Sequence, residues 1–472
     1  MPYPEGSLSV GTVRALALAA ALGLPVAAAS AQQLRIPMVG DAAVDSASVA
    51  RTAYREARAS ASPHDAARLL LRATTAWPSQ PAYWLAQTST SVATHNLDRF
   101  RTSVMTLMAM QQAPALGRDS LLRSWIARTG SEGWFGDFER AVSPVHAAAP
   151  AAHVPAPLFV EGIDVDPRSG RLYATSVRGG SVLRCETGST WRDLELARDA
   201  RIQAVFAVRV APDSAFLWVS SAAHALRANT GAGQPAARAG IARVRAHDGA
   251  VVEWHDLPRA DSAHMPGDLL ALPNGDVLVS DSDAAQLYLW RSRESTWRVI
   301  SHVAFRSPQG MALVAEQRVV LVADYSHGLY RVHLDGLAIS RIADAPGTSV
   351  LGLDGLAWHD GQLYAVQNGT GVPQLLAITL SDDLRAVRSV RVADRQSDLA
   401  PAPSAVASGP DGVLYVGNSP WESFAAGDAA PVSAPTALLR LAISPRSRRG
   451  TRTVAVTPSP LSSCSRSSAA SP

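Results

Sequence analysis

Hydrophobic and polar residues alternate with two different periods along this chain. Between about residues 46 and 126, apolar residues recur three and four positions apart among Ala, Leu and Arg, which predicts amphipathic helices. From about 158 to 443, short runs of β-branched and aromatic residues alternate with Gly, Asp and Pro, which predicts strands joined by tight turns. The pattern therefore predicts a small helical segment followed by a large β domain.

The helical segment contains two similar units. Asp65 and Asp98 stand near the starts of two helical runs 33 positions apart, close to the tetratricopeptide (TPR) period. The residues Trp77-Pro78-Ser79-Gln80-Pro81 resemble the link between such units. The segment would serve either as a docking surface for a protein partner or as a helical cap or spacer, since arrays of this kind usually need about three repeats or more.

The β region repeats one phrase six times. Each repeat has a small residue, a short apolar strand, a turn, and a second strand that is centred on an aromatic residue or Leu and ends in a polar residue. The small residues stand at 162, 207, 267, 310, 355 and 405, and their separations of 45, 60, 43, 45 and 50 positions suit four-stranded blades. The sequence predicts a mainly β fold, a six-bladed β-propeller, with a small α-helical, TPR-like N-terminal segment.

We expect five segments along the chain. They are a signal peptide (1–31), a helical TPR-like segment (32–145), an Ala/Pro linker (146–157), the six-bladed β-propeller (158–443) and a disordered Arg/Ser-rich tail (444–472). The linker assignment rests on a run made almost entirely of Ala, Pro and His.

The first segment has the features of an export signal. Arg14 precedes an apolar stretch from Ala15 to Val26, and Ala29-Ser30-Ala31 suits a signal peptidase. The stretch is shorter than the ~20 apolar residues of a transmembrane helix. We therefore expect a periplasmic or secreted protein with no membrane span after signal cleavage, and an uncleaved N-terminal anchor is the alternative.

Charge and cysteine content narrow the possible partners. The formal net charge is +3, but residues 444–472 hold five Arg and no acidic residue, so the body is near neutral and no nucleic-acid partner is expected. Cys185 and Cys464 are the only cysteines, and the second lies in the tail, so no disulfide framework is expected. Serine-nucleophile, metalloprotease, phosphate-loop and dinucleotide motifs do not occur in the context that each requires.

The repeat also predicts where polar side chains gather. In an antiparallel pair, the residue that opens the first strand and the residue that closes the second lie at the same end. Six blades would therefore place two polar rings around one mouth of the central channel. The first ring holds Glu161, Asp268, Gln309, Asp354 and Ser404, and the channel rim holds Ser176, Ser221, Asp281, Asp324, Gln367 and Asn418. Such oxygen-rich side chains suit Ca²⁺, or they only cap strands and hydrogen-bond turns.

Three phrases resemble the SMP-30/gluconolactonase/LRE-like family. The residues from Glu161 to Pro167 resemble its first blade, and those from Ser307 to Leu313 and from Leu353 to Trp358 resemble its fourth and fifth. The likeness spans roughly 157–443. It implies a divalent metal, usually calcium, at the channel mouth and a reaction that hydrolyses lactones or esters.

The resemblance also implies roles for particular residues. Glu161, Gln309 and Asp354 would be metal ligands, with Asp354 also the catalytic proton shuttle. The family has Asn where this chain has Gly267 and Gln309; Asp268 would substitute from the position beside Gly267 as a fourth ligand. The family's substrate-binding Arg is replaced here by Met265, so specificity for sugar lactones is not implied.

Two functions remain open at this point. One is a metal-dependent hydrolase of a small-molecule lactone or ester, and the other is a non-catalytic interaction or ligand-binding protein of the cell envelope. His327 and His359 lie beside turns and are expected to be solvated. Trp421 would either stack on a ligand at the rim or pack against the edge of the fold.

Overall fold

The computed structural model describes residues 42–130, 132–185, 190–227, 238–259, 263–396, 398–425 and 434–443. The chain forms two compact units. One contains the residues up to Ser143 together with 344–351 and 369–372, and the other contains most of the chain from Pro144 onward. The predicted signal peptide and C-terminal tail lie outside the described residues.

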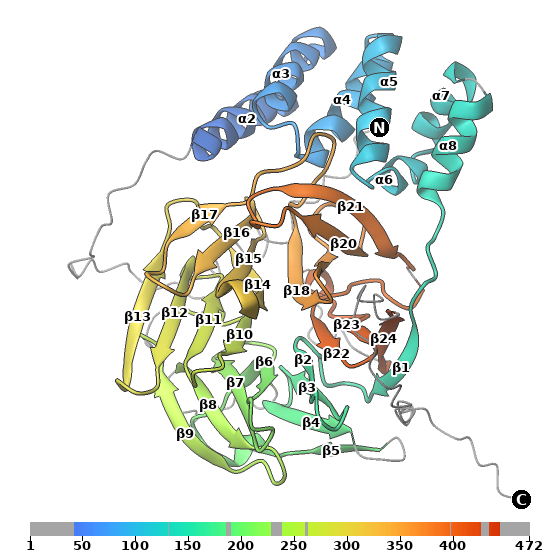
Figure 1. Ribbon diagram of the computed structural model, residues 1–472. Helices are drawn as coiled ribbons and strands as arrows, with labels where there is room; N and C mark the ends of the chain where they lie inside the picture. The colour runs from blue at the N-terminus through green and yellow to red at the C-terminus, as the bar shows by residue number, and fades with distance from the viewer. Residues whose placement is uncertain are drawn as a thin grey trace, which may run out of the picture. The chain divides into compact units, whose positions relative to one another are not determined.

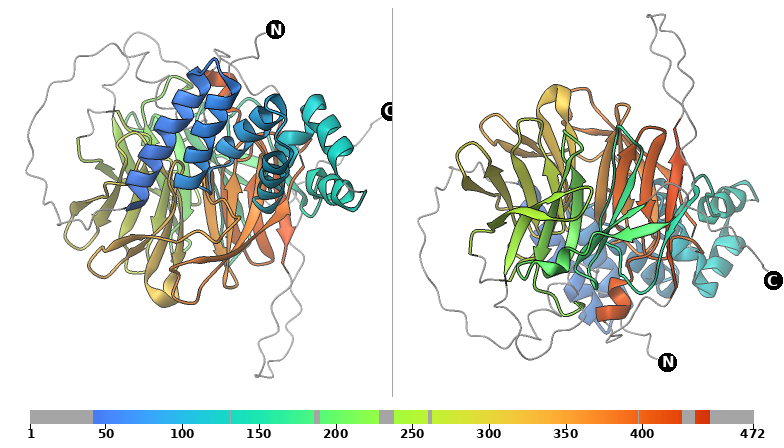
Figure 2. Two further views of the ribbon diagram at one scale, coloured as in Figure 1. Left: turned by 90° about the horizontal axis from the view of Figure 1, so that it is seen from above. Right: turned by 90° about the horizontal axis from the view of Figure 1, so that it is seen from below.

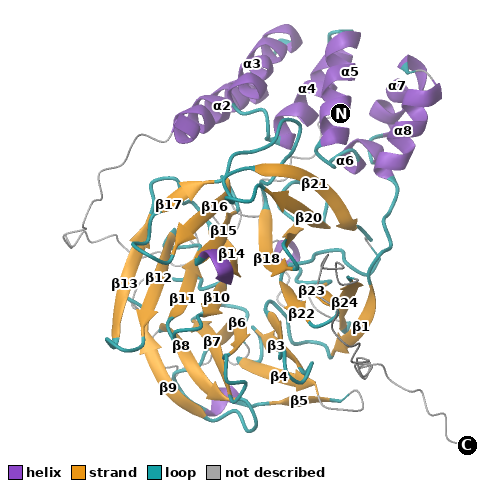
Figure 3. Ribbon diagram, in the orientation of Figure 1, coloured by secondary structure: helices purple, strands orange, loops and turns teal. Residues whose placement is uncertain are grey.

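The first unit is helical, as predicted (Figure 3). Its helices are α2 (Ala42–Ala59), α3 (Pro63–Ala76), α4 (Pro81–Ala93), α5 (Leu97–Ala109), α6 (Pro114–Gly117), α7 (Ser120–Thr129) and α8 (Glu132–Val142). Polar side chains cap the first turn of four of them, and α3 and α5 are examples. Ser62 accepts a hydrogen bond from the backbone N–H of Asp65, and Asn96 accepts one from that of Arg99.

Apolar side chains of these helices form the core of the first unit. Phe100, Leu107, Ile126 and Phe138 are completely buried in one cluster that joins α5, α7 and α8. None of the helices in the described ranges is both long and apolar enough to cross a membrane. The helical character of this segment is confirmed, and its TPR-like nature stays a prediction.

The second unit is a six-bladed β-propeller, as the repeat predicts (Figure 1). Each blade is a four-stranded antiparallel sheet, and the edge-on views of Figure 2 show strands of successive blades standing side by side. The strands, in blade order, are β2 (Ile163–Val165), β3 (Leu172–Ser176), β4 (Ser181–Cys185) and β5 (Trp191–Asp193); β6 (Ala204–Val210), β7 (Phe216–Ala222), β8 (Ala239–Arg245) and β9 (Val251–Asp256); β10 (Asp268–Ala271), β11 (Val277–Asp281), β12 (Gln286–Arg291) and β13 (Thr296–Ser301); β14 (Pro308–Val314), β15 (Val319–Asp324), β16 (Gly328–His333) and β17 (Ile339–Arg341); β18 (Leu353–His359), β19 (Gln362–Gln367), β20 (Gln374–Leu380) and β21 (Val387–Asp394); and β22 (Val406–Gly409), β23 (Gly412–Val416), β24 (Thr436–Ala442) and β1 (Ala149–Val154).

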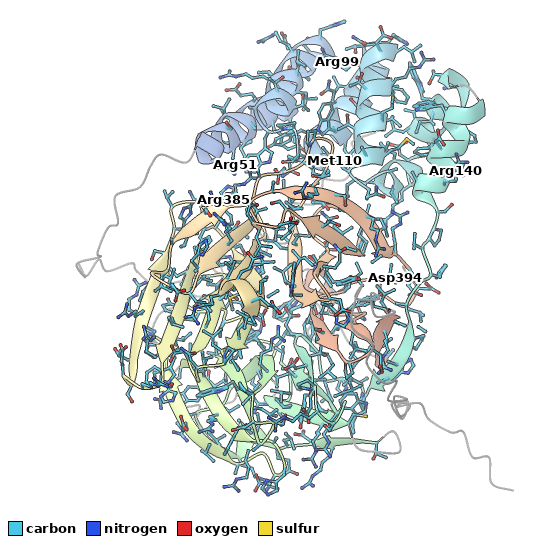
Figure 4. All side chains as sticks on the ribbon, viewed as in Figure 1. Arg51, Arg99, Met110, Arg140, Arg385 and Asp394 are labelled. Carbon is cyan, nitrogen blue, oxygen red and sulfur yellow. The ribbon has the colours of Figure 1, made fainter. Side chains whose placement is uncertain are left out.

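Strand β1 closes the ring, and this corrects the predicted linker at 146–157. The strand pairs with β24, so the sixth blade combines the beginning and the end of the propeller sequence. Asp394, labelled in Figure 4 and fully buried, fastens the approach to β1. Its Oδ1 accepts hydrogen bonds from the backbone N–H groups of Ala147 and Ala148, both at 2.8 Å. Ala and Pro at 149–152 look like linker composition because they carry little strand propensity of their own, and pairing with β24 decides their structure.

Three of the small residues of the repeat lie where inner strands of neighbouring blades approach one another. A Cβ atom on Gly310 would lie 2.2 Å from the carbonyl oxygen of Asp354 in the next blade, and one on Gly355 would lie 2.6 Å from that of Ser404. A Cβ on Gly162 would lie 2.5 Å from the carbonyl oxygen of Phe206. Close packing at the centre of the ring therefore requires small residues at these positions of the repeat.

Two smaller expectations are also corrected. His327 is 2% exposed and its Nδ1 contacts the carbonyl oxygen of Ala304, so it is buried rather than solvated. His359 has a side chain only 10% exposed, and its Nδ1 lies 2.9 Å from the hydroxyl of Ser408.

Replacing Gly310 with Ala tests the steric requirement. We expect Gly310→Ala to lower the free energy of unfolding by about 2 to 3 kcal/mol or more, because the added methyl group meets backbone that cannot retreat freely. Gly409→Ala is the matched control on another inner strand, where the nearest atom to an added Cβ lies 3.6 Å away. Denaturant unfolding of both variants decides the point, and equal stabilities would contradict the steric explanation.

Candidate functional site

A small cavity lies where the inner strands of all six blades meet. Its volume is about 20 Å³, which is roughly the space of one water molecule or ion. It is lined by Glu161, Gly162, Ala207, Arg209, Gly267, Asp268, Gln309, Gly310, Asp354, Gly355, Ser404, Ala405 and Val406. The five members of the first predicted ring are therefore brought together, from positions far apart in the sequence.

Bulges at the start of the inner strands explain how these side chains reach the cavity. In the second, fourth and fifth blades, the pairs 206–207, 309–310 and 354–355 each lie opposite a single residue of the neighbouring strand. Such a bulge re-aims a side chain that a regular pleat would direct elsewhere. The first residue of a pair is polar at Gln309 and Asp354, whereas Phe206 interrupts the polar ring in the second blade.

Strand register in the third blade corrects the predicted alignment. Leu269 pairs with Val279 in the way that Met311 pairs with Val322 in the fourth blade. Asp268 therefore stands at the small-residue position, and Gly267 stands at the position of Gln309. Asp268 lines the cavity, but it belongs to a different ring from the other predicted ligands.

Both carboxylate oxygens of Asp268 already have partners. Oδ1 accepts a hydrogen bond from the backbone N–H of Leu269 at 2.8 Å, and Oδ2 accepts one from that of Met311 at 2.8 Å. Oδ1 also forms an ion pair with Arg209, with Nη2 at 2.8 Å. Asp268 thus joins the inner strands of the third and fourth blades, and its role as a metal ligand stays a prediction.

Arg209, on the inner strand β6, is the site residue that the sequence analysis missed. Its Nη1 donates hydrogen bonds to the carbonyl oxygens of Ile163 at 2.9 Å and Val208 at 3.2 Å. With the ion pair to Asp268, it connects the first three blades. A signal was present in the sequence, because this register position is Asp, Arg, Leu, Ala, Ala and Ala in the six blades.

Asp354 is held by a residue beside the predicted rim. Asn368 Nδ2 donates hydrogen bonds to Asp354 Oδ2 and to the carbonyl oxygen of Pro403, both at 2.8 Å. The Tyr325 hydroxyl in turn donates to Asn368 Oδ1 at 2.9 Å. This chain of hydrogen bonds fixes the orientation of the Asp354 carboxylate, and only tertiary structure shows it.

Glu161 is covered by an aromatic side chain. The indole Nε1 of Trp421, in the short helix α9 (Trp421–Ala425), donates a hydrogen bond to Glu161 Oε2 at 2.7 Å. Trp421 is 7% exposed and packs edge-on against Phe159 and His224. Of the two sequence-based interpretations, packing describes Trp421 better than an exposed stacking platform, although its N–H reaches the site.

Gln309 has its amide nitrogen bound and its amide oxygen directed toward Gly267. Its Nε2 donates a hydrogen bond to the Ser307 hydroxyl at 2.8 Å. The Gln309 Oε1 atom would lie 3.4 Å from a Cβ atom built on Gly267. The missing side chain at Gly267 therefore leaves the longer Gln309 arm room at the cavity.

Burial and charge act together on the acidic residues of the cavity. Burial raises the pKa of Asp268 above its usual range, Arg209 opposes the rise, and the charge of Asp354 adds to it. Burial likewise raises the pKa of Asp164 beside the cavity, again opposed by Arg209. Among the lining residues, three carboxylates accompany a single arginine, so negative charge is in excess.

The predicted channel-rim residues do not line this cavity. Five of them are completely buried. Their hydrogen bonds agree with the alternative interpretation of the sequence, in which these residues cap strands and turns. Ser176 and Ser221 accept hydrogen bonds from backbone N–H groups, and Asp324 accepts four. Gln367 accepts one from the Gln374 side chain. The sixth, Asn418, makes a bridge with Ala402 and accepts a hydrogen bond through its backbone oxygen.

Asp281 shows the structural role of the rim most clearly. Its side chain is buried against His264, whose Nδ1 lies 2.5 Å from Asp281 Oδ2 and whose Nε2 lies 2.8 Å from the carbonyl oxygen of Arg259. Asp281 also accepts a hydrogen bond from the backbone N–H of Met265. The pair fastens the segment that leads to Gly267.

The donor set fits a hard cation in kind. Within the described ranges, no three His, Cys, Asp or Glu side chains gather closely enough to hold a metal ion. A site here therefore depends on the amide of Gln309 as well as on Glu161 and Asp354. Two carboxylates and an amide are oxygen donors of the type that Ca²⁺ prefers.

Comparison with known proteins found similarity among solved structures. No known family model matches the chain, and no curated protein matches it either. Solved structures that share the propeller do exist. The likeness is one of fold.

Three such structures illustrate the comparison. A gluconolactonase from Xanthomonas campestris is 14% identical, with 63% of this chain and 98% of that chain covered and a TM-score of 0.41. Regucalcin, a calcium-binding protein from Agrobacterium tumefaciens, is 16% identical over 64% and 97%, with a TM-score of 0.43. Virginiamycin B lyase from Staphylococcus aureus is 17% identical over 57% and 80%, with a TM-score of 0.38. These similarities are too low to assign an activity.

The His264–Asp281 pair predicts a pH dependence of stability. Burial alone lowers the pKa of His264, but the hydrogen bond and charge of Asp281 outweigh it and raise the pKa above 6.5. The stabilisation is therefore complete below about pH 6.5 and is lost as pH rises through the folded-state pKa. We expect the difference in unfolding free energy between the parent protein and His264→Gln to shrink from pH 6 to pH 9. Replacement of the exposed His247 by Gln is the control. If the difference in unfolding free energy for His264→Gln stays constant across this pH range, the stabilising role of the His264–Asp281 pair is contradicted.

Proposed function

We propose that the protein is a hydrolase of small lactones or esters that uses a divalent cation, such as Ca²⁺, at the mouth of the propeller channel. The observation that carries the proposal is the convergence of Glu161, Gln309 and Asp354 on one small cavity. A bound cation would polarise a substrate carbonyl and acidify water at this position. The excess of carboxylates over arginine in the lining favours a cationic occupant.

Asp354 is the residue best placed to accept a proton. It lines the cavity, and Asn368 occupies its Oδ2 atom through a 2.8 Å hydrogen bond. That bond fixes the carboxylate plane, so proton transfer needs no reorientation of the side chain. Glu161 and Gln309 would then serve as ligands alone, with Trp421 holding Glu161 in place.

A non-catalytic ligand-binding protein is the second candidate. It is favoured by the Arg209–Asp268 pair and by the Trp421–Glu161 hydrogen bond, because both tie up acidic side chains at the cavity. In this alternative the cavity binds a cation or small ligand without turnover, and the helical unit presents the surface for a protein partner. Propellers support both kinds of function, so activity must be measured.

Calorimetry tests the cation site directly. We expect Ca²⁺ to bind the purified, chelator-treated protein, and we expect Glu161→Gln and Asp354→Asn each to weaken binding by about tenfold or more, because each removes a charged oxygen ligand. Asp335→Asn removes an exposed carboxylate paired with Arg318 and is the matched control. Absence of heat with Ca²⁺, Mg²⁺, Mn²⁺ and Zn²⁺ would rule out the cation site.

A panel of γ- and δ-lactones and aryl esters tests turnover. We expect hydrolysis that a chelator abolishes and that Asp354→Asn lowers by roughly a hundredfold in kcat, the usual size of a general-base contribution. Release of acid can be followed with a pH indicator. Cation binding without hydrolysis of any compound would favour the non-catalytic alternative.

A further inference from the structure

Arg209 places a positive charge in the same cavity as Glu161, Gln309 and Asp354. We propose that Arg209 is a resident cation that determines the ion affinity of the channel, because its guanidinium group opposes binding of a divalent ion by these three side chains. The inference rests on the proposed cation site. It assigns to Arg209 a specificity-determining role.

The guanidinium group cannot move out of the cavity without breaking several interactions. Its Nη1 donates to the carbonyl oxygens of Ile163 and Val208, and its Nη2 pairs with Asp268 at 2.8 Å. These partners lie on or beside inner strands of the first three blades. The side chain is 13% exposed, so water screens its charge only weakly.

The positive charge of Arg209 lies in the same cavity as the proposed ligands. Arg209 contacts Asp268 directly, and both residues line the same cavity as Asp354. Asp268 is itself committed to the backbone N–H groups of Leu269 and Met311. A divalent ion beside Asp354 would therefore be repelled by a fixed positive charge.

Closing the ring does not by itself demand an arginine. Elsewhere, neighbouring blades are joined by hydroxyl groups and backbone contacts: Thr175 donates to the carbonyl oxygen of Phe206, and Ser220 donates to that of Pro266. The positions equivalent to Arg209 in the last four blades are Leu270, Ala312, Ala357 and Ala407. The charge of Arg209 is thus the feature that needs a function beyond packing.

Ca²⁺ titration of charge variants tests this role. We expect Arg209→Met to bind Ca²⁺ roughly tenfold more tightly or better than the parent protein, because it removes one nearby positive charge while retaining an extended side chain. Arg209→Lys keeps the charge and should bind with nearly the parent affinity. The shift of thermal midpoint caused by Ca²⁺ gives a second readout, and it should be larger for Arg209→Met.

A double variant removes the ion pair as a unit. Arg209→Met combined with Asp268→Asn deletes one positive and one negative charge, so it should return Ca²⁺ affinity toward that of the parent. This variant also serves if Arg209→Met alone does not fold. A double variant that differs from the parent by more than about tenfold would count against a charge effect.

The outcomes separate this inference from the proposed function. Binding by the parent with unchanged or weaker binding by a folded Arg209→Met overturns the role of Arg209 and leaves the cation site standing. Binding by Arg209→Met alone supports the role of Arg209 and overturns the cation site of the natural protein. Failure of both proteins to bind any divalent ion overturns both proposals.

Discussion

Close approach of the six inner strands at the propeller axis is the constraint on which the rest of the structure depends. Where Gly162, Gly310 and Gly355 lie, a single methyl group would meet the backbone of the next blade. Small residues allow the blades to close, and bulges beside them direct the preceding side chains toward the axis. The same geometry therefore produces both the ring and the polar cavity at its centre.

The third blade contacts its neighbours through a charged residue in place of a glycine. Asp268 occupies the small-residue position there, and its carboxylate binds the backbone of the fourth blade and the guanidinium group of Arg209. Burying a carboxylate is costly unless it is paired and hydrogen-bonded, and Asp268 is both. A residue that resembles a metal ligand in the sequence thus replaces a steric contact with an electrostatic one.

The cavity that results is small, acidic and partly neutralised from within. Glu161, Gln309 and Asp354 supply oxygen atoms, while Trp421 and Asn368 hold two of them in defined orientations. Arg209 is the one basic side chain among the described residues of this lining. The cavity volume of about 20 Å³ is roughly the space of one water molecule or ion.

The local sequence pattern was enough to predict the helical segment and the six blades. It was also enough to predict that Glu161, Gln309 and Asp354 meet at one cavity. This was possible because small residues, turns and alternating strands report constraints that act within each repeat. Tertiary structure alone decided the pairing of β1 with β24, the register that moves Asp268 to another ring, and the burial of the predicted rim residues. It also decided the contacts of Arg209, Asn368 and Trp421, because these join different blades; Trp421 and Glu161 are 260 positions apart, and no pattern within a single repeat encodes their meeting.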